Sequence, residues 1–514
     1  MTIRPWQDHL PRGEAMTAAD LTAEGTLLRA WARHWGEAPD ARLWLEAGGP
    51  PAAADDAHPA GRWWSAGAFE EATRRAAGRL HAAGLVPGDR VVWSTPSSVA
   101  ALVAHVGAWR AGLVVVPANI AYSERELGHL VTDTGATAAI VARPEQAGWV
   151  QRAAPGRMVV TGPDLDLPDG DPGPLDAAGP DDPALICFTS GTTGVPKGAV
   201  LRHRNLLAAT ASVTAAWRWT AGDRLVHCLP VFHAHGLAVG VYGTMLAGAS
   251  AVLLPGFDPA AVAEVVERHR ATMFFGVPSM YHRMMGSGRL DALAGLRLCV
   301  SGSAPLSREL HAQVQSATGI TVLERYGMTE TLMNVSNPYE GERRAGTVGF
   351  PLPGVEVCLA ADGEILVRGP NVFDGYWQRP EATAEVFVPA DDGGTPWFRT
   401  GDLGEESGGY LVIRGRSKEL IISGGFNVYP GEVEDVLATH PAVAEVAVTG
   451  TPSAEWGEVV TAWIVPAGRT PSVEELAEFT APVLARYKRP RIVRVVEALP
   501  RNALGKVVRG QLGA

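Results

Sequence analysis

The sequence predicts an α/β protein: a large N-terminal domain of mainly parallel sheets with covering helices, followed by a small α+β C-terminal domain. Three observations predict it. Apolar, strand-like runs alternate with helical patterns through most of the chain. The length of 514 residues exceeds what one compact core holds. After Asp402 the pattern changes, and roughly one hundred residues remain, which is enough for a second domain.

The alternation is clearest between residues 69 and 142, where helical spacing and short apolar runs take turns. The helical segments are Phe69–Ala83, Val99–Trp109 and Glu124–Thr134, and the strand-like runs are Gly88–Trp93, Leu113–Pro117 and Ala138–Ala142. The stretch from Pro155 to Asp182 is rich in Pro, Gly and Asp and is interpreted as an irregular connector. The weakly patterned residues before Ser65 are interpreted as a decorated or partly disordered arm.

Composition argues against several classes of partner. The chain is 46% apolar and 19% charged, as in globular proteins, and its net charge is −11. Because Lys and Arg form no long cluster, neither nucleic acid nor an anionic membrane is expected as a partner. The cysteines, Cys187, Cys228, Cys299 and Cys358, stand singly and without metal or redox spacing. They are typical of buried, reduced thiols in a cytoplasmic protein, and the N-terminus has no hydrophobic signal segment.

One uncharged stretch, from Gly236 to Phe257, reaches membrane-spanning length. Several glycines and a Pro255-Gly256 break interrupt it. It is therefore interpreted as a buried helix followed by a strand over Ser250–Leu254.

The most informative segment is the loop Thr189–Gly198, which lies between the strand-like runs Ala184–Phe188 and Ala199–Leu201. Its three glycines, four hydroxyl side chains and one lysine are typical of a loop that wraps a polyphosphate. Glycine lets backbone N–H groups approach phosphate oxygens closely. The spacing of its glycines and lysine differs from that of the common P-loop. By itself, such a loop is about as often a plain linker as a phosphate-binding loop.

Further motifs accompany this loop in a fixed order. They are Ser301-Gly-Ser-Ala-Pro305, Glu324-Arg-Tyr-Gly-Met-Thr-Glu-Thr331, Thr400-Gly-Asp402, Gly415-Arg-Ser-Lys418, Gly424-Gly-Phe-Asn-Val-Tyr-Pro430 and Pro500-Arg-Asn-Ala-Leu-Gly-Lys506. With these motifs the chain resembles, over nearly its whole length, the acyl-adenylate-forming ligases, a superfamily of acyl-CoA synthetases, luciferase and peptide-synthetase adenylation domains. The resemblance implies that a carboxylate attacks the α-phosphorus of ATP, releasing pyrophosphate, and that a thiol then expels AMP. It also implies a domain of residues 1–415 and a mobile domain of residues 416–514.

The same resemblance implies which residues hold the nucleotide. The β- and γ-phosphates would be held by Thr189, Ser190, Gly191, Thr192, Thr193, Gly194 and Lys197. The adenine and ribose would be held by Gly302, Ser303, Ala304, Glu324, Arg325, Tyr326, Gly327, Asp402 and Arg416, with Asp402 accepting from the ribose hydroxyls. Glu330, directly after Thr329, would bind Mg²⁺, a hard cation that prefers carboxylate and phosphate oxygens.

A lysine at the position of Lys506 carries adenylation in this superfamily. It reaches from the small domain to the carboxylate and α-phosphate oxygens, where negative charge accumulates. The small domain swings at Lys418 and exchanges Lys506 for a thiol-side loop that contains Gly424 and Gly425. The resemblance therefore implies ATP, Mg²⁺ and coenzyme A as cofactors and co-substrates.

The acyl group is expected near His233, Arg283, Ser303 and Met333. Arg283 is the informative residue, because a buried guanidinium is costly without a partner and a second carboxylate would pair with it bidentately. The segments Arg325–Asn334 and Arg344–Gly349 are also similar to malonyl-CoA synthetases, in which an arginine at this location binds the distal carboxylate of malonate or methylmalonate. Two alternatives stay open: Arg283 on the solvent face of a helix, and His233 and His235, in the segment Phe232–Gly236, as core histidines.

The expected acceptor is coenzyme A, because only eight residues follow Lys506 and a fused carrier domain needs about 80. A free-standing carrier protein stays open as acceptor, as does a stand-alone adenylating ligase for a larger natural-product carboxylic acid. A non-catalytic binding module is a remote alternative, because a decayed enzyme would be expected to lose Lys506, Glu330 or Lys197, and all three are present.

Overall fold

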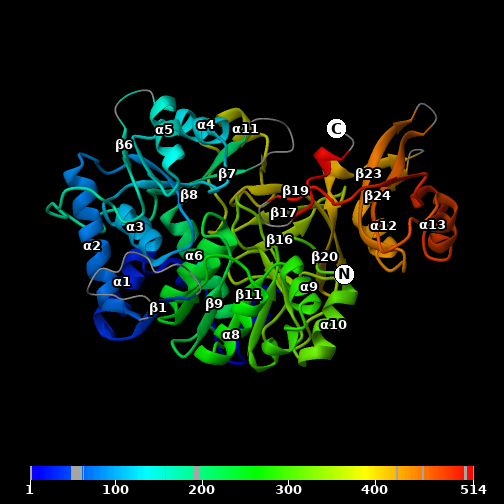
Figure 1. The fold of residues 1–514 in the computed structure, drawn as a ribbon, viewed down its shortest axis with the longest axis horizontal. Helices are drawn as coiled ribbons and strands as arrows, with labels where there is room; N and C mark the ends of the chain where they lie inside the picture. The colour runs from blue at the N-terminus through cyan, green and yellow to red at the C-terminus, as the bar shows by residue number, and fades with distance from the viewer. Residues whose placement is uncertain are drawn as a thin grey trace.

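The computed structural model describes residues 3–47, 61, 63–154, 156, 158–189, 196–423, 426–453, 456–502 and 506–512. Within these residues the strands form four sheets. Figure 1 shows helices packed around the sheets of a large body and a smaller unit, in orange, at the C-terminal end. The predicted α/β class, with mainly parallel sheets in the large part, is confirmed.

The largest sheet has nine strands in the order β15-β14-β13-β12-β11-β9-β10-β1-β2. Its strands are β1 (Arg42–Glu46), β2 (Trp64–Ser65), β9 (Arg224–His227), β10 (Ser250–Leu253), β11 (Met273–Gly276), β12 (Leu298–Ser301), β13 (Leu323–Tyr326), β14 (Val335–Ser336) and β15 (Phe350–Pro351). From β1 to β13 the neighbours run parallel, so the carboxyl ends of these strands share one edge. Apolar residues of α8 (Pro259–His269), α9 (Pro278–Gly286) and α10 (Arg308–Thr318) cover one face.

The second sheet has six strands in the order β6-β5-β3-β4-β7-β8. They are β3 (Arg90–Ser94), β4 (Val114–Pro117), β5 (Ala138–Val141), β6 (Val159–Thr161), β7 (Pro183–Thr189) and β8 (Lys197–Arg202). All pair in parallel except β7 and β8, which are antiparallel with Thr189 opposite Lys197. The predicted phosphate loop therefore connects the two strands of a hairpin at the edge of this sheet.

The main core lies between these two sheets. It is filled from α1 (Leu27–Glu37), α2 (Ala66–Ala82), α3 (Val99–Arg110), α6 (His203–Ala216) and α7 (Tyr242–Leu246). Its centre is aromatic, with Trp31, Trp109 and Tyr242 fully buried and in mutual ring contact. The opposite face of the six-stranded sheet is covered by α4 (Glu124–Thr134) and α5 (Pro144–Ala153).

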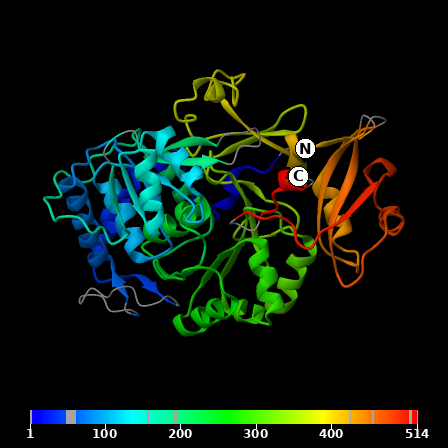
Figure 2. The same ribbon diagram turned by 45° about the horizontal axis from the view of Figure 1, so that its top comes forward.

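The two remaining sheets lie closer to the C-terminus. An antiparallel sheet holds β16 (Glu356–Leu359), β17 (Glu364–Arg368), β18 (Phe387–Val388), β19 (Trp397–Ser407) and β20 (Tyr410–Arg416), with the short α11 (Pro380–Ala384) nearby. The smaller unit holds β21 (Ile421–Ser423), β22 (Phe426–Val428), β23 (Val443–Ser453), β24 (Gly457–Pro466) and β25 (Ile492–Val495), packed with α12 (Pro430–Leu437) and α13 (Val473–Thr480). In Figure 2 the last residues, in red, run from this unit back toward the large body.

The N-terminal segment differs from the predicted arm. Residues 3–47 are folded, and β1 pairs with β10 inside the largest sheet. Trp31 and Trp44 are fully buried. The Ala/Pro/Gly-rich composition concealed Leu27, Leu28, Trp31 and Trp35, which share one face of α1 and pack into the main core.

Smaller differences concern individual elements. The predicted connector contains the short strand β6. The uncharged stretch forms a buried helical segment, η3 (His235–Val241) and α7, followed by β10. In the part of the chain that the structure describes, no helix is long and apolar enough to cross a membrane. Cys228 and Cys299 are buried as predicted, whereas Cys187 and Cys358 are half-buried, and none of the four forms a disulfide.

Candidate functional site

The predicted site residues come from three sheets and meet at one place. Gly302, Ser303 and Ala304 follow β12, and Tyr326 ends the neighbouring strand β13. Both therefore lie at the carboxyl edge of parallel strands, where open α/β sheets bind ligands. Asp402 and Arg416 are cross-strand partners on β19 and β20.

Asp402 links two of these sheets. The Tyr326 hydroxyl donates to its Oδ2 at 2.6 Å, and Arg416 Nε lies 3.1 Å from its Oδ1. Burial raises the pKa of Asp402, while Arg416 and Tyr326 favour the charged form. A carboxylate has about four lone-pair sites. Since each oxygen has one neighbour here, sites remain for two ribose hydroxyls.

Glu330 is the carboxylate expected to bind Mg²⁺, and its side chain fits that role. It is buried, which raises its pKa, and its Oε1 accepts a hydrogen bond of 3.0 Å from the Tyr376 hydroxyl. No cluster of three or more His, Cys, Asp or Glu side chains in the described ranges could hold a metal ion. A single carboxylate suits Mg²⁺ when phosphates and water supply its other ligands. Thr329, beside it, is half-buried.

Lys197 contacts the same tyrosine that donates to Glu330. Its Nζ is 5.3 Å from the centre of the Tyr376 ring, within the range of a cation–π interaction. Thr189 Oγ1 donates to the Lys197 carbonyl at 3.4 Å across the base of the hairpin. The other predicted phosphate-binding residues, Ser190, Gly191, Thr192, Thr193 and Gly194, lie outside the described residues, as do Gly424 and Gly425 of the predicted thiol-side loop.

Lys506 approaches this site from the C-terminal tail. Its ammonium lies in the electrostatic field of Asp402 and Arg416, and burial together with Arg416 lowers its pKa. Its backbone N–H donates to Asn502 Oδ1 at 3.0 Å, and the Asn502 N–H donates to the Lys506 carbonyl at 2.9 Å. The tail is therefore turned so that the lysine comes near the predicted ribose-binding pair.

Arg509 fixes the tail behind Lys506. Its guanidinium donates to Glu419 Oε2 at 2.9 Å and to both carboxylate oxygens of Glu434 at 2.8 Å. Glu419 ends the turn η5 (Ser417–Glu419), which contains the predicted hinge residue Lys418, and Glu434 lies on α12. This pairing connects the tail both to the predicted hinge and to the body of the smaller unit.

We expect Arg509→Met to reduce adenylation by about 10-fold, because the tail that carries Lys506 loses a partly buried, bidentate anchor. Arg509→Lys should recover part of the rate. The measurement is acid-dependent pyrophosphate release, with thermal melting in parallel. A fall in melting temperature at an unchanged rate would contradict this role for the anchor.

Arg325, predicted as a nucleotide-binding residue, has a side chain that lies beside the predicted acyl-binding residue Ser303. It is buried at the end of β13, and burial lowers its pKa to about 10. Its only side-chain hydrogen bond within the described residues is to Ser303 Oγ, at 3.5 Å, and its Nε has no partner. The guanidinium lies against Gly302, where a Cβ would come within 2.4 Å of Arg325 Cζ. Arg325 is therefore a buried cation beside Ser303, one of the predicted acyl-binding residues.

His235 lies close to Arg325. It is buried, and neither of its ring nitrogens has a hydrogen-bond partner among the residues that the structure describes. Burial, with Arg325 as a further cause, holds its pKa well below the ordinary value. His233 is half-buried, and burial lowers its pKa to about 4, so both histidines are neutral at pH 7. Met333 is buried, and Ser303 has a positive φ of 67°, uncommon for a residue with a side chain.

The acyl-binding role of Arg283 stays a prediction, and its position in this structure favours the alternative interpretation. Arg283 is exposed on α9, and its guanidinium lies 4.8 Å from the centre of the Phe257 ring. The buried face of this helix is formed by Tyr281 and Met284, three residues apart, and Arg283 lies off that face. Arg283 therefore has the solvent-facing position that was the alternative interpretation.

Glu324 has a structural role in addition to its place in the motif. It is buried, and its Oε1 accepts a hydrogen bond of 3.0 Å from the Leu306 backbone. Burial raises its pKa to about 8. Gly327 packs tightly against the chain that follows, because a Cβ there would come within 2.0 Å of the Leu332 carbonyl oxygen.

Sequence reasoning missed Tyr376, which lies in Gly375-Tyr-Trp377, a short motif that resembles many turns. It gave His235 only as a core histidine, because burial without a partner in the described part of the chain cannot be read from sequence.

Comparisons with known proteins agree with this geometry. The family profile described as "AMP-binding enzyme" matches residues 46–377, and "AMP-binding enzyme C-terminal domain" matches residues 432–506. A feruloyl-CoA synthase of Amycolatopsis sp is 38% identical over 85% of this chain and 91% of its own. A malonate–CoA ligase of Arabidopsis thaliana is 35% identical over 84% and 78%. The structure of ATP-bound MatB from Rhodopseudomonas palustris superimposes with a TM-score of 0.86 at 38% identity, covering 97% and 98%.

Proposed function

The chain belongs to the AMP-binding enzyme family and is an AMP-forming acid–CoA ligase, and from that premise we propose that its acid is a short dicarboxylic acid, malonate or methylmalonate. ATP and coenzyme A are its co-substrates, and Mg²⁺ is typical of the family. The relatives differ in the acid that they are named for, so the choice of acid depends on this chain's own site.

The observation that carries the proposal is Arg325. A buried guanidinium without an acidic partner is costly, and a ligand carboxylate removes that cost by pairing with it bidentately. Ser303 and the neutral His235 add hydrogen-bonding groups beside it. A molecule with two carboxylates can present one to Arg325 and leave the other to react.

The proposed site residues divide the reaction between them. Lys506 neutralises charge on the reacting carboxylate and α-phosphate, Asp402 and Arg416 hold the ribose, and Lys197 holds the outer phosphates. Mg²⁺ on Glu330 would supply further charge neutralisation at the phosphates. We propose that residues 416–514 then turn about Lys418, which removes Lys506 and brings the thiol-side loop to the adenylate.

An aryl acid is the second candidate, because feruloyl-CoA synthases are among the relatives. Aryl rings need an apolar pocket, and the buried Arg325 side chain occupies space next to the acyl residues Ser303 and Met333. The positive charge of Arg325 therefore favours a dicarboxylic acid over an aryl acid.

The test is a panel of acids, comprising malonate, methylmalonate, an aryl acid and a long-chain acid. Each is assayed for pyrophosphate release with and without coenzyme A, and with a free-standing carrier protein as alternative acceptor. We expect malonate or methylmalonate to give the highest kcat/KM and coenzyme A to be acylated. A higher kcat/KM for the aryl or long-chain acid would contradict the proposal.

A further inference from the structure

Tyr376 contacts both charged groups that are proposed to act on the outer phosphates. Its hydroxyl donates to Glu330 Oε1 at 3.0 Å, and its ring lies under Lys197 Nζ at 5.3 Å. A phenol hydroxyl carries its proton at neutral pH, so Tyr376 is the donor in this hydrogen bond. Tyr376 is therefore a permanent donor to one carboxylate oxygen and a support for one ammonium group.

The backbone around Tyr376 is bound on one side to β8, the strand that begins at Lys197. The Trp377 N–H donates to the Gly198 carbonyl at 2.7 Å, and the Val200 N–H donates to the Gly375 carbonyl at 3.1 Å. Tyr376 itself forms an antiparallel bridge with Ala199. Lys197 and Tyr376 thus belong to adjacent, hydrogen-bonded backbones.

On its other side the same segment is bound to the chain around Glu330. The Phe373 N–H donates to the Glu330 carbonyl at 2.9 Å. The buried Asn371 side chain donates to the carbonyls of Thr331 at 2.8 Å and Met333 at 3.1 Å. The main chain of Glu330 and its carboxylate are therefore both held by residues 371–376.

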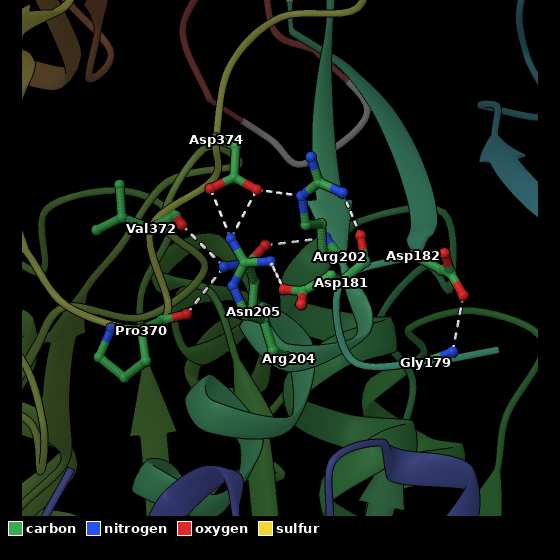
Figure 3. Close-up of polar contacts among 9 residues, drawn as sticks. All are labelled: Gly179, Asp181, Asp182, Arg202, Arg204, Asn205, Pro370, Val372 and Asp374. Atoms are coloured by element: carbon green, nitrogen blue, oxygen red, sulfur yellow. Dashed lines mark hydrogen bonds and ion pairs between the residues drawn. The ribbon is translucent and has the colours of Figure 1, made fainter. Parts of the chain in front are cut away.

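A cluster of polar side chains also binds residues 370–374, as Figure 3 shows. Asp374 accepts hydrogen bonds from Arg202 and, at 2.7 Å to each oxygen, from Arg204. Asn205 Nδ2 donates to the carbonyls of Pro370 at 2.9 Å and Val372 at 2.8 Å. Arg202 ends β8, and Arg204 and Asn205 lie at the start of α6. The cluster therefore connects the segment to the strand that begins at Lys197.

We propose that Tyr376 is a positioning residue that couples Glu330 to Lys197, so that Mg²⁺ and the outer phosphates are bound as one unit. With one oxygen of Glu330 occupied by the Tyr376 hydroxyl, the carboxylate keeps a fixed orientation and presents its remaining lone pairs to a metal ion. The coupling rests on the proposed roles of Glu330 and Lys197, and it is independent of which acid the enzyme uses.

The test is the Mg²⁺ dependence of Tyr376→Phe, which keeps the ring under Lys197 and removes only the hydroxyl. We expect the Mg²⁺ concentration for half-maximal pyrophosphate release to rise by about 10-fold, as for a lost charge-assisted hydrogen bond, with much of kcat restored at saturating Mg²⁺. Tyr410→Phe is the matched control. This variant likewise removes a tyrosine hydroxyl, but one that donates to the backbone carbonyl of Glu342 instead of to Glu330. It should leave the Mg²⁺ dependence unchanged. A shift below 2-fold in Tyr376→Phe, or an equal shift in Tyr410→Phe, would overturn the coupling.

A second measurement needs no turnover. Calorimetric titration of ATP at low and saturating Mg²⁺ should show a smaller Mg²⁺-dependent gain in affinity for Tyr376→Phe than for the wild type. In a Glu330→Gln background, Tyr376→Phe should cause no further change in the Mg²⁺ dependence, because the carboxylate that the hydroxyl orients toward the metal is already gone. Additive effects would overturn the coupling, and an unaltered Mg²⁺ dependence in Glu330→Gln alone would overturn the metal site itself. If Tyr376→Phe does not fold, Asp374→Asn, which loosens the segment at the surface, must shift the Mg²⁺ dependence in the same direction or the proposal fails.

Discussion

Lys506→Ala should lower acid-dependent pyrophosphate release by about 10²–10³-fold, because it removes a cation from the point where negative charge accumulates. Thioester formation from supplied acyl-adenylate and coenzyme A should survive, because that step uses the other arrangement of the smaller unit. The lysine lies in the electrostatic field of Asp402 and Arg416 in this structure, where the proposed adenylation role requires it. The measurement is the rate of each half-reaction, and an equal loss in both would contradict the assignment.

The pH dependence provides a control for this prediction. Burial and the neighbouring Arg416 lower the pKa of Lys506, so the ammonium loses its proton at a lower pH than an ordinary lysine does. The kcat/KM of adenylation, which reports the free enzyme, should therefore fall on the alkaline side below the usual lysine range. Lys506→Arg, whose guanidinium stays protonated, should show no such fall in whatever activity remains.

Arg325→Leu should lower kcat/KM for malonate by about 10²–10³-fold, because the distal carboxylate would lose its buried partner. The same variant should gain activity toward a monocarboxylic acid of similar length, since the pocket no longer holds an unpaired charge. Arg325→Lys should fall between the wild type and Arg325→Leu, because an ammonium cannot pair bidentately. The measurement is kcat/KM for both acids with each variant.

Arg283→Ala is the matched control for Arg325. It removes an exposed arginine whose neighbour is the Phe257 ring, and malonate kcat/KM should change by less than about 2-fold. If Arg283→Ala abolished malonate activity while Arg325→Leu did not, the helix would have to present Arg283 to the substrate in another conformation, and the assignment of Arg325 would fail.

Much of the fold followed from local pattern. Glu124–Thr134 and the alternating strands were predictable because buried strands and amphipathic helices leave their periodicity in the sequence. The N-terminal segment was not, because the runs around the fully buried Trp31 and Trp44 are short and lie in an Ala/Pro/Gly-rich region. Their partners are distant in sequence: Trp44 pairs with Ala251 of β10, and the Trp31 ring contacts Trp109 and Tyr242.

The site was predictable to the extent that it follows motifs. Asp402 and Arg416 belong to motifs of the resemblance, and the structure makes them cross-strand partners. The motif of Arg283 predicted the helix but not the exposed position of this residue, because Tyr281 and Met284 form the buried face. Tyr376 has no local signal at all. Its role arises from contacts with Glu330 and Lys197 that only the packed chain brings together. The roles of the residues in catalysis remain predictions.

The pairing of Asp402 with Arg416 has a further consequence for the order of events. Strand β20 ends at Arg416 and the turn that contains Lys418 follows at once, so the side chain beside Asp402 is attached to the start of the pivot. In the proposed swing, the smaller unit would begin to turn directly after Arg416, one of the two residues proposed to bind the ribose. No other side chain would be needed to connect the ribose site with the hinge. Release of AMP and the return of the smaller unit to its first arrangement would then both depend on Arg416. A slower release of AMP would therefore delay the next turnover.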